Sequence, residues 1–223
     1  TTSITGVGGN ETVTMTHSQP VIALGDGTDK VITTQTIMQA GDTSAHSING
    51  GLGADTIEMA AGTTGLTDAD FKDVSNIETF LFGTGTNTAT FGTRSAALFT
   101  TSITGVGGAE TITLTASQPV ISLGAGVDTV NTTQAIMQAQ SGTGHTINFG
   151  GDTDILVFAA GTSGVDDDDF TGITNLETLT LGTGTNSITL GTKAAAAGIV
   201  NINGNSGADT IVADSAITLT FTA

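Results

Sequence analysis

Cysteine, tryptophan and tyrosine are absent from this 223-residue sequence, and proline occurs only twice. Without cysteine the chain has no disulfide framework, no CxxC redox chemistry and no cysteine-based zinc site. Phenylalanine is the only aromatic residue, with nine copies. These absences predict a narrow interior filled mainly by small aliphatic side chains.

Basic residues are also scarce, because four Lys and Arg stand against 21 Asp and Glu, for a net charge of -17. This charge excludes nucleic acid as a main partner. No apolar run approaches the roughly 18 residues of a membrane span, so we predict no transmembrane segment. The acidic, lysine-poor and threonine-rich composition favours a secreted protein at the extracellular cell surface.

Catalytic signatures are missing as well. The sequence contains no GxSxG and no HExxH, and it lacks the aromatic platforms that usually accompany the carboxylate pair of a glycosidase. We therefore expect no enzyme, no catalytic residues and no organic cofactor.

The sequence repeats itself at an offset of 99 residues. Positions 1–93 align with 100–192 without a gap, and 54 of these 93 pairs are identical. A third copy begins before Gly204, where GNSGADTIV matches GVGGAETIT. We expect two full repeat units, 1–99 and 100–198, and a partial third unit, 199–223, belonging to a longer array.

A shorter pattern lies within each unit: a glycine-rich turn, an acidic or amide residue, and an apolar residue two positions later. The pattern is complete in GGLGADTIE (50–58), where Asp55 precedes Ile57, and nearly complete in LGDGTDKVI and GNSGADTIV. Glycine provides the left-handed backbone of a tight turn, and the carboxylate can cap turn amides or bind a cation. The pattern predicts a short strand after each turn.

These turns resemble the nonapeptide repeats of the RTX (repeats-in-toxin) proteins, the haemolysin-type calcium-binding repeats, in a degenerate form. The run from GAGVDTV through GGDTDILVFAAGTSG to DDDFTGITNLETLTLGTGTNSITLG resembles, more specifically, the repeat region of RTX-type bacterial surface-layer (S-layer) proteins. The resemblance implies an all-β, right-handed parallel β-roll or β-solenoid, export to the cell surface, and calcium bound between successive turns.

The spacing of the turns predicts a solenoid with insertions. Eighteen residues, two nonapeptides, separate Glu11 from Asp29, which fits one coil. Longer spacings follow, with excursions around QAGDTSAH and AAGTTGLTDADFKDVSNIE. In the second excursion we expect a short helical turn with Asp68, or Asp167 in the second unit, as its N-cap, and Phe71 or Phe170 as an apolar plug.

Calcium is the main candidate ligand, because it binds six to eight oxygens and a Gly- and Asp-rich turn offers carbonyls and carboxylates together. The same side chains can instead bond turn amides and bind no metal. Against calcium, Glu11 and Glu110 replace Asp, Asn87 and Asn186 lack a charge, and Asp152 replaces a glycine. The candidate metal ligands are Asp26, Asp29, Gly50, Gly51, Gly53, Asp55, Gly204, Gly207 and Asp209.

Alternations such as TVTMT (12–16), TITLT (111–115) and TLTFT (218–222) resemble the threonine ranks of ice-binding solenoids. Such ranks need threonines on consecutive coils, whereas these segments recur only every 99 residues. We therefore predict that the threonines are simply the outward half of alternating strands.

The sequence favours a structural segment of a secreted bacterial surface protein that forms a layer, filament or stalk. The alternative is an RTX-type adhesin or extender segment whose ligand-binding module lies outside this chain. We expect self-association, contact with cell-surface polysaccharide, and cations that neutralise carboxylates at the turns or at Asp166–Asp169 between subunits. The Asp166–Asp169 run can equally be a solvated helix start.

Overall fold

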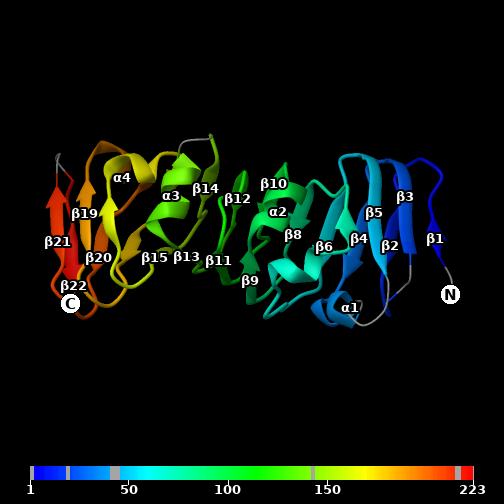
Figure 1. Cartoon of the computed structure of the whole chain (residues 1–223), viewed down its shortest axis with the longest axis horizontal. Coiled ribbons are helices and arrows are strands. Elements are labelled where there is room, and N and C mark those ends of the chain that lie inside the picture. The colour runs from blue at the N-terminus through cyan, green and yellow to red at the C-terminus, as the bar shows by residue number, and fades with distance from the viewer. Residues whose placement is uncertain (1–2, 19–20, 41–45, 142–143, 214–216, 223) are drawn as a thin grey trace.

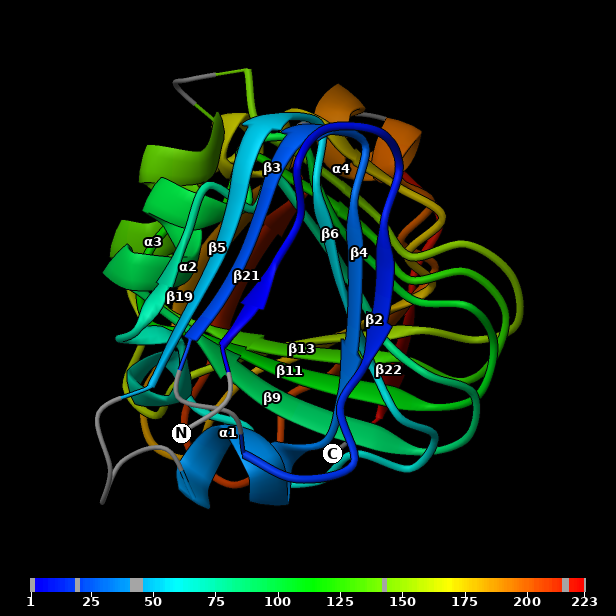
Figure 2. The ribbon, with the colours of Figure 1, turned by 90° about the vertical axis from the view of Figure 1, so that its right-hand side faces the viewer.

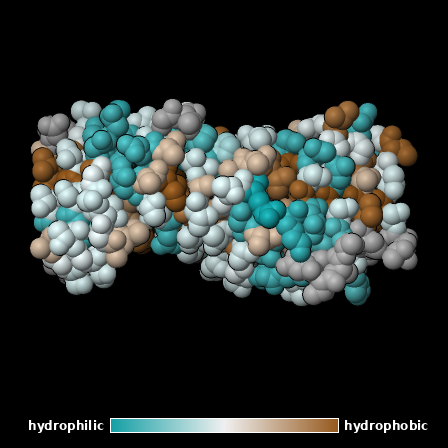
Figure 3. Space-filling model, viewed as in Figure 1, coloured by the Kyte–Doolittle hydropathy of each residue, from teal (hydrophilic) through white to brown (hydrophobic). Residues whose placement is uncertain are grey.

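The computed structural model describes residues 3–18, 21–40, 46–141, 144–213 and 217–222. The chain forms a rod of stacked coils, with β1 (Ile4–Thr5) near one end and β22 (Thr220–Thr222) near the other (Figure 1). Seen along its long axis, the rod has three sides around one interior (Figure 2). The rod narrows near its middle, and hydrophilic and hydrophobic residues are interspersed along the side seen in Figure 3.

The strands form four sheets, named here A to D. Sheet A contains β1, β3 (Val21–Gly27), β5 (Ser47–Gly53) and β7 (Val74–Ser75). Sheet B contains β2 (Thr12–Thr14), β4 (Lys30–Thr33), β6 (Thr56–Met59), β8 (Thr79–Leu81), β10 (Ser102–Thr104), β12 (Val120–Ser122), β14 (Thr146–Asn148) and β17 (Ile173–Thr174).

Sheet C contains β9 (Asn87–Phe91), β11 (Glu110–Leu114), β13 (Thr129–Thr132), β15 (Ile155–Phe158), β18 (Thr178–Thr180), β20 (Asn201–Asn203) and β22. Sheet D contains β16 (Ser163–Val165), β19 (Ser187–Leu190) and β21 (Thr210–Ala213). Neighbouring strands within each sheet pair in parallel, as in the pair of β4 with β6. The strand-rich fold with parallel sheets agrees with the solenoid class expected from the sequence.

The coil lengths vary in a recurring order. In sheet B, the inward residues Val13, Val31, Ile57, Phe80 and Ile103 are successive partners. The coil that joins Val13 to Val31 is the short one expected from the spacing of Glu11 and Asp29, and the insertions make the next three coils longer. The same short coil and the same long coil then follow again, from Ile103 to Ile121 and from Ile121 to Ile147.

Residues 99 positions apart lie on different sides of the rod. Val13 belongs to sheet B, whereas Ile112 belongs to sheet C. Four coils separate Val13 from Ile103 within sheet B, and nine further residues bring the chain to Ile112 on the next side. An offset of 99 residues therefore carries the chain through four coils and on to the next side.

The interior is a continuous apolar column formed by the inward residue of each strand. Val31, Ile57, Ile103 and Ile121 are fully buried, and each packs between its partners in the adjacent coils. Burying one such side chain contributes roughly 1.5–3 kcal/mol. A phenylalanine cluster fills the interior around β8 and β9. It consists of Phe71, Phe80, Phe82, Phe91 and Phe99.

Short helices lie in or beside the excursions. They are α1 (Gln35–Ala40), α2 (Thr93–Leu98), α3 (Gln134–Ser141) and α4 (Thr192–Ala197), with the 3-10 helices η2 (Asp68–Phe71) and η3 (Asp167–Phe170). Two of them, α2 and α4, follow β9 and β19, where the sequence predicted no insertion. Within QAGDTSAH, residues 41–45 lie outside the described part of the chain.

The short helical turn expected in the second excursion is present as η2 and η3, but the predicted caps were wrong. Thr67 and Asp166 are the N-caps, each one residue earlier than predicted. Asp68 instead accepts hydrogen bonds from the backbone N–H groups of Gly92 and Ser95, each 2.9 Å long, at the start of α2. The carboxylate thus ties one excursion to a helix in the next coil, a contact that local sequence rules do not encode.

The two phenylalanines predicted to plug the excursions are buried, with Phe71 and Phe170 each 1% exposed. The Phe71 ring meets Phe80 and Phe99 edge-on, with centroids 5.8 and 5.0 Å apart. Each 3-10 helix is thereby fastened to the apolar interior, as the sequence predicted.

Candidate functional site

Glycine-rich corners join one side of the rod to the next. In the corner between β5 and β6, Gly51 and Gly53 have φ angles of 113° and 140°. A Cβ atom at Gly51 would collide with the carbonyl oxygen of Gly25 in the preceding coil, and one at Gly53 would collide with that of Gly27. Only glycine satisfies both the left-handed backbone and the close stacking of coils here.

An acidic side chain follows each corner of the first stack and points into the rod. The backbone N–H of Glu11 donates to Asp29 Oδ1, and that of Asp29 donates to Asp55 Oδ1, both at 2.7 Å. The N–H of Asp55 donates in turn to Glu78 Oε2 at 2.8 Å. Each carboxylate therefore bonds the backbone of the coil before it, and we call this series the first carboxylate ladder.

A second carboxylate ladder lies at the corner between sheets B and C. The backbone N–H of Glu110 donates to Asp128 Oδ1, and that of Asp128 donates to Asp154 Oδ1, both at 2.7 Å. The ladder ends at Glu177, whose Oε2 accepts from the N–H of Asp154 at 2.9 Å. At its start, the Asn87 side chain donates to Glu110 Oε1 at 2.9 Å.

The same arrangement begins again at the corner between sheets C and D. Asn186 Oδ1 accepts from the backbone N–H of Thr162 at 2.9 Å, and the Asn186 side chain donates to Asp209 Oδ1 at 2.7 Å. This third corner is therefore built in the same way as the start of the second ladder.

The ladders leave one oxygen of most carboxylates buried and without a hydrogen-bond partner. These oxygens are Glu11 Oε2, Asp29 Oδ2, Asp55 Oδ2, Glu110 Oε2, Asp128 Oδ2 and Asp154 Oδ2. A buried carboxylate oxygen without a partner is costly, so each such oxygen favours binding a proton or a cation.

Burial raises the pKa of Asp128 to about 7, and repulsion from Glu110 and Asp152 adds to the rise. Burial also raises the pKa of Asp154 to about 6, again with a contribution from Asp152. In the first ladder, burial raises the pKa of Asp55, and repulsion from Asp29 and Glu78 adds to the rise. The ladders therefore hold carboxyl groups that gain stability when their charge is neutralised.

The predicted metal ligands occupy three different settings. Asp29 and Asp55 are adjacent rungs of the first ladder, and Gly50, Gly51 and Gly53 form the corner that leads to Asp55. Asp26 is exposed, so it does not join the buried Asp29. Gly204, Gly207 and the half-buried Asp209 form the corner between β20 and β21.

The donor types suit calcium, since each ladder offers unpartnered carboxylate oxygens beside backbone carbonyls. Among the residues that the structure describes, no three His, Cys, Asp or Glu side chains group closely enough to hold a metal ion. A calcium ion at a ladder would therefore draw much of its coordination from carbonyl oxygens of the corner.

Several residues of the ladders were not identified from the sequence. Glu78 and Glu177 close the first and second ladders, although each follows an asparagine corner instead of a glycine-rich one. Asn76 and Asn175 have φ angles of 51° and 56°, the conformation that glycine supplies elsewhere. The motif acidic-Thr-apolar, shared by Glu78-Thr79-Phe80 and Asp55-Thr56-Ile57, could have found them.

Comparison with protein-family models, with curated proteins and with solved structures finds no match to this chain. Within the described residues, no helix is long and apolar enough to cross a membrane.

Proposed function

We propose that this chain is a structural repeat segment of a secreted, RTX-type bacterial cell-surface protein, and that it builds a layer, filament or stalk. The observation that carries the proposal is that one sequence repeat continues directly into the next. Phe80 in the first repeat pairs with Ile103 in the second, and Ala89 pairs with Ile112. Because strands of both repeats share sheets B and C, an array of such units forms one unbroken rod.

The rod is a right-handed solenoid whose unit is 99 residues long. Right-handed connections between parallel strands of one sheet are strongly preferred in proteins. The same succession of a short coil and a long coil occurs at equivalent places in the two repeats, which supports the unit length. Each unit then advances the chain by four coils and one side.

The alternative function, an extender in an RTX-type adhesin, is supported by the shape of the molecule. The rod is long and narrow, with its first and last strands at opposite ends (Figure 1). Such a shape holds whatever is attached at its two ends far apart. A layer requires lateral contacts in addition, so the state of assembly distinguishes the two roles.

Calcium binding at the ladders is part of the proposal. Asp29 and Asp55 would hold the ion in the first ladder through their unpartnered oxygens, together with carbonyls of the Gly50–Gly53 corner. Half-buried Asp209, beside Gly204 and Gly207, would hold a second ion. The bound ion would neutralise adjacent carboxylates and so allow a chain of charge -17 to pack against copies of itself.

The proposal is tested by adding a unit. A chain with a second copy of residues 100–198 inserted between positions 198 and 199 should be a longer rod of unchanged cross-section. Four and one-third coils at about 4.8 Å predict a gain of about 21 Å, measurable by small-angle X-ray scattering. An unchanged length, or a second separate body, would refute the continuous-array role.

Assembly is examined on the same two chains by light scattering and electron microscopy, with millimolar calcium and with excess chelator. Regular sheets or filaments that form with calcium would support the layer. A rod that stays monomeric in both conditions would support the stalk or extender.

A further inference from the structure

The outward side chains of sheet C form two ranks on seven consecutive coils. The first rank follows the register of the strands and contains Thr88, Thr111, Thr129, Ile155, Thr178, Asn201 and Thr220. The second rank lies two residues further along each strand and contains Thr90, Thr113, Asn131, Val157, Thr180, Asn203 and Thr222. The threonines are the outward residues of alternating strands, as the sequence predicted, but in sheet C they also stand on neighbouring coils, which the recurrence of TITLT at 99 residues did not indicate.

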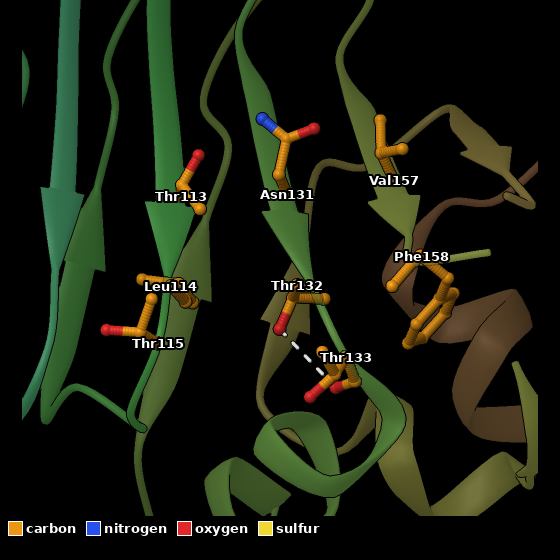
Figure 4. A pocket seen from close by; sticks show the side chains of 9 residues that line it. Thr113, Leu114, Thr115, Asn131, Thr132, Thr133, Val157 and Phe158 are labelled. Atoms are coloured by element: carbon orange, nitrogen blue, oxygen red, sulfur yellow. Dashed lines mark hydrogen bonds between the residues drawn. The ribbon is translucent and has the colours of Figure 1, made fainter. Parts of the chain in front are cut away.

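The ranks make a regular two-dimensional grid. Neighbouring parallel strands lie about 4.8 Å apart, and residues i and i+2 of one strand lie about 6.6 Å apart. Figure 4 shows Thr113, Asn131 and Val157 side by side on β11, β13 and β15. A groove of 290 Å³ lies at the C-terminal ends of these three strands, where these residues and the two that follow each of them line it. Sheet C thus presents evenly spaced hydroxyl, amide and methyl groups along one side of the triangle in Figure 2.

The hydroxyl groups of the ranks are largely free to bind something outside the chain. Among the described residues, Thr90, Thr111, Thr113, Thr178 and Thr180 form no side-chain hydrogen bond with the protein, and all are partly exposed. These hydroxyls are also held in place, because each strand carrying them has a partner on both sides, which for β9 is β11 and a bridge to Leu66.

The composition of this face differs from that of sheet B. The fourteen positions of the two ranks contain nine Thr, three Asn and two β-branched apolar residues, and none is charged. The outward positions of sheet B include Lys30 and Glu58, which form an ion pair at 2.9 Å, and also Leu81. In a chain of charge -17, sheet C therefore keeps its outward face uncharged on all seven strands, whereas β4 and β6 of sheet B carry charges.

We propose that the two ranks of sheet C are an ice-binding face, whose ligand is the ordered water lattice at the surface of an ice crystal. Ice presents hydrogen-bonding oxygens on a repeating grid of comparable dimensions. A rigid grid of hydroxyls matches such a lattice at many points at once, and the threonine methyl groups keep the water between them ordered. Each contact is weak, and the regular repeat supplies the affinity.

Other occupants fit this face less well. Flat sugar crystals are usually bound by aromatic platforms, and the fourteen rank positions include no aromatic side chain. A second copy of the chain would bury too little surface, because six coil spacings by two ranks cover about 29 by 12 Å, well below the roughly 800 Å² per partner of a stable complex.

The experiment measures thermal hysteresis, ice recrystallisation inhibition and adsorption of the labelled chain to a growing ice hemisphere. Thr113→Lys and Thr180→Lys place a long charged side chain within the ranks and should abolish most of all three effects. Thr104→Lys is the matched control, because Thr104 is a partly exposed, outward threonine of β10 in sheet B. It should keep the wild-type values, with circular dichroism confirming that all variants fold.

A conservative variant gives a graded readout. Thr113→Val resembles Val157 two coils further along the rank, so it should retain part of the ice activity that Thr113→Lys loses.

Four results would overturn the proposal. They are the absence of any ice effect in the wild-type chain, equal loss of ice activity in Thr104→Lys, binding to crystalline chitin or cellulose without an ice effect, and a dimer in solution that Thr113→Lys dissociates.

Discussion

The two carboxylate ladders share the same backbone hydrogen bonds but differ in their corner residues, and one of these differences introduces a charge. In the first ladder the corner before Asp55 contains Gly53, and in the second the equivalent corner before Asp154 contains Asp152. Asp152 has a φ angle of 83°, which is unfavourable for a residue other than glycine, and its Oδ2 accepts from the backbone N–H of Gly126 at 3.0 Å. Its charge raises the pKa values of Asp128 and Asp154 further than burial alone. One substitution at a corner thus changes the pKa values of two buried carboxyl groups in the second ladder.

The largest effect is expected when the second corner is copied into the first. Gly53→Asp forces a side chain into the carbonyl oxygen of Gly27 at a left-handed φ. It should cost about 3 kcal/mol or more of the free energy of unfolding, measured by urea denaturation. Gly62→Asp is the control, because Gly62 also has a positive φ but open space around it. Equal losses in the two variants would show that coil stacking plays no part.

Calcium should stabilise the chain by the next largest amount. At a hundredfold excess over the dissociation constant, one site adds about 2.7 kcal/mol, visible as a rise in melting temperature at constant ionic strength. Asp55→Asn should remove more of this rise than Asp154→Asn, because Asp55 is one of the two residues proposed to hold the ion in the first ladder. An identical melting temperature with calcium and with chelator would mean that neither ladder binds the ion.

The pH dependence of stability should be dominated by the second ladder. The pKa of Asp128 rises from 3.8 to about 7 on folding, because of burial and then repulsion from Glu110. Because the pKa of Asp128 is higher in the folded than in the unfolded state, protonation of Asp128 stabilises the folded state. This stabilisation is complete below about pH 4 and is lost as the pH rises through 7. We expect the free energy of unfolding to fall by about 3 kcal/mol between pH 4.5 and 8.

Asp128→Asn is the matched variant for this pH effect, since the amide keeps an acceptor for the Glu110 N–H while removing the charge. It should flatten the profile, with Asp55→Asn changing it less. The Asp68 carboxylate, which caps α2, acts in the opposite direction. Burial alone would raise the pKa of Asp68, but hydrogen bonds from Ser95, Arg94 and Gly92 lower it. The stabilisation by the charged Asp68 carboxylate is therefore lost only at more acidic pH. A flat wild-type profile would contradict the expected role of Asp128.

The smallest effect is expected from the reverse exchange. Asp152→Gly removes an unfavourable backbone conformation and a repulsive charge, at the expense of the bond from Gly126. We expect a gain of about 0.5–1 kcal/mol at pH 8 and a lower pKa for Asp128, followed by NMR titration of the side-chain carboxyl. A pKa for Asp128 that does not move would show that burial alone sets it.

Much of the local structure could be predicted from the sequence. The alternation around Val31 and Ile57 predicted strands with one buried face, and the glycines before Asp55 predicted the corners. These features depend on the chemistry of neighbouring residues, which a single sequence reveals directly.

The remaining features depend on how coils stack. The insertions around η2 and η3 change the coil length, and only the paired register shows that Thr111 stands beside Thr88 and Thr129. The role of Asp68 as a cap for α2 likewise arises because an excursion meets a helix of the next coil. Glu78 and Glu177, the last residues of the two ladders, were not recognised because each follows an asparagine corner instead of a glycine-rich one. Contacts between coils could therefore not be predicted from the sequence, whereas local propensities could.

In the proposed array of 99-residue units, the step of one side per unit gives the rod a screw symmetry. If the array continues in the same way, a given residue of successive units points in three directions in turn and returns to its first direction in the fourth unit. Every outward feature would then trace a slow spiral around the rod. Neighbouring rods could meet equivalent surfaces on all three sides, which is the geometry of a lattice with threefold contacts. A substitution repeated in every unit would alter all three sides equally, whereas one placed in every third unit would alter a single side.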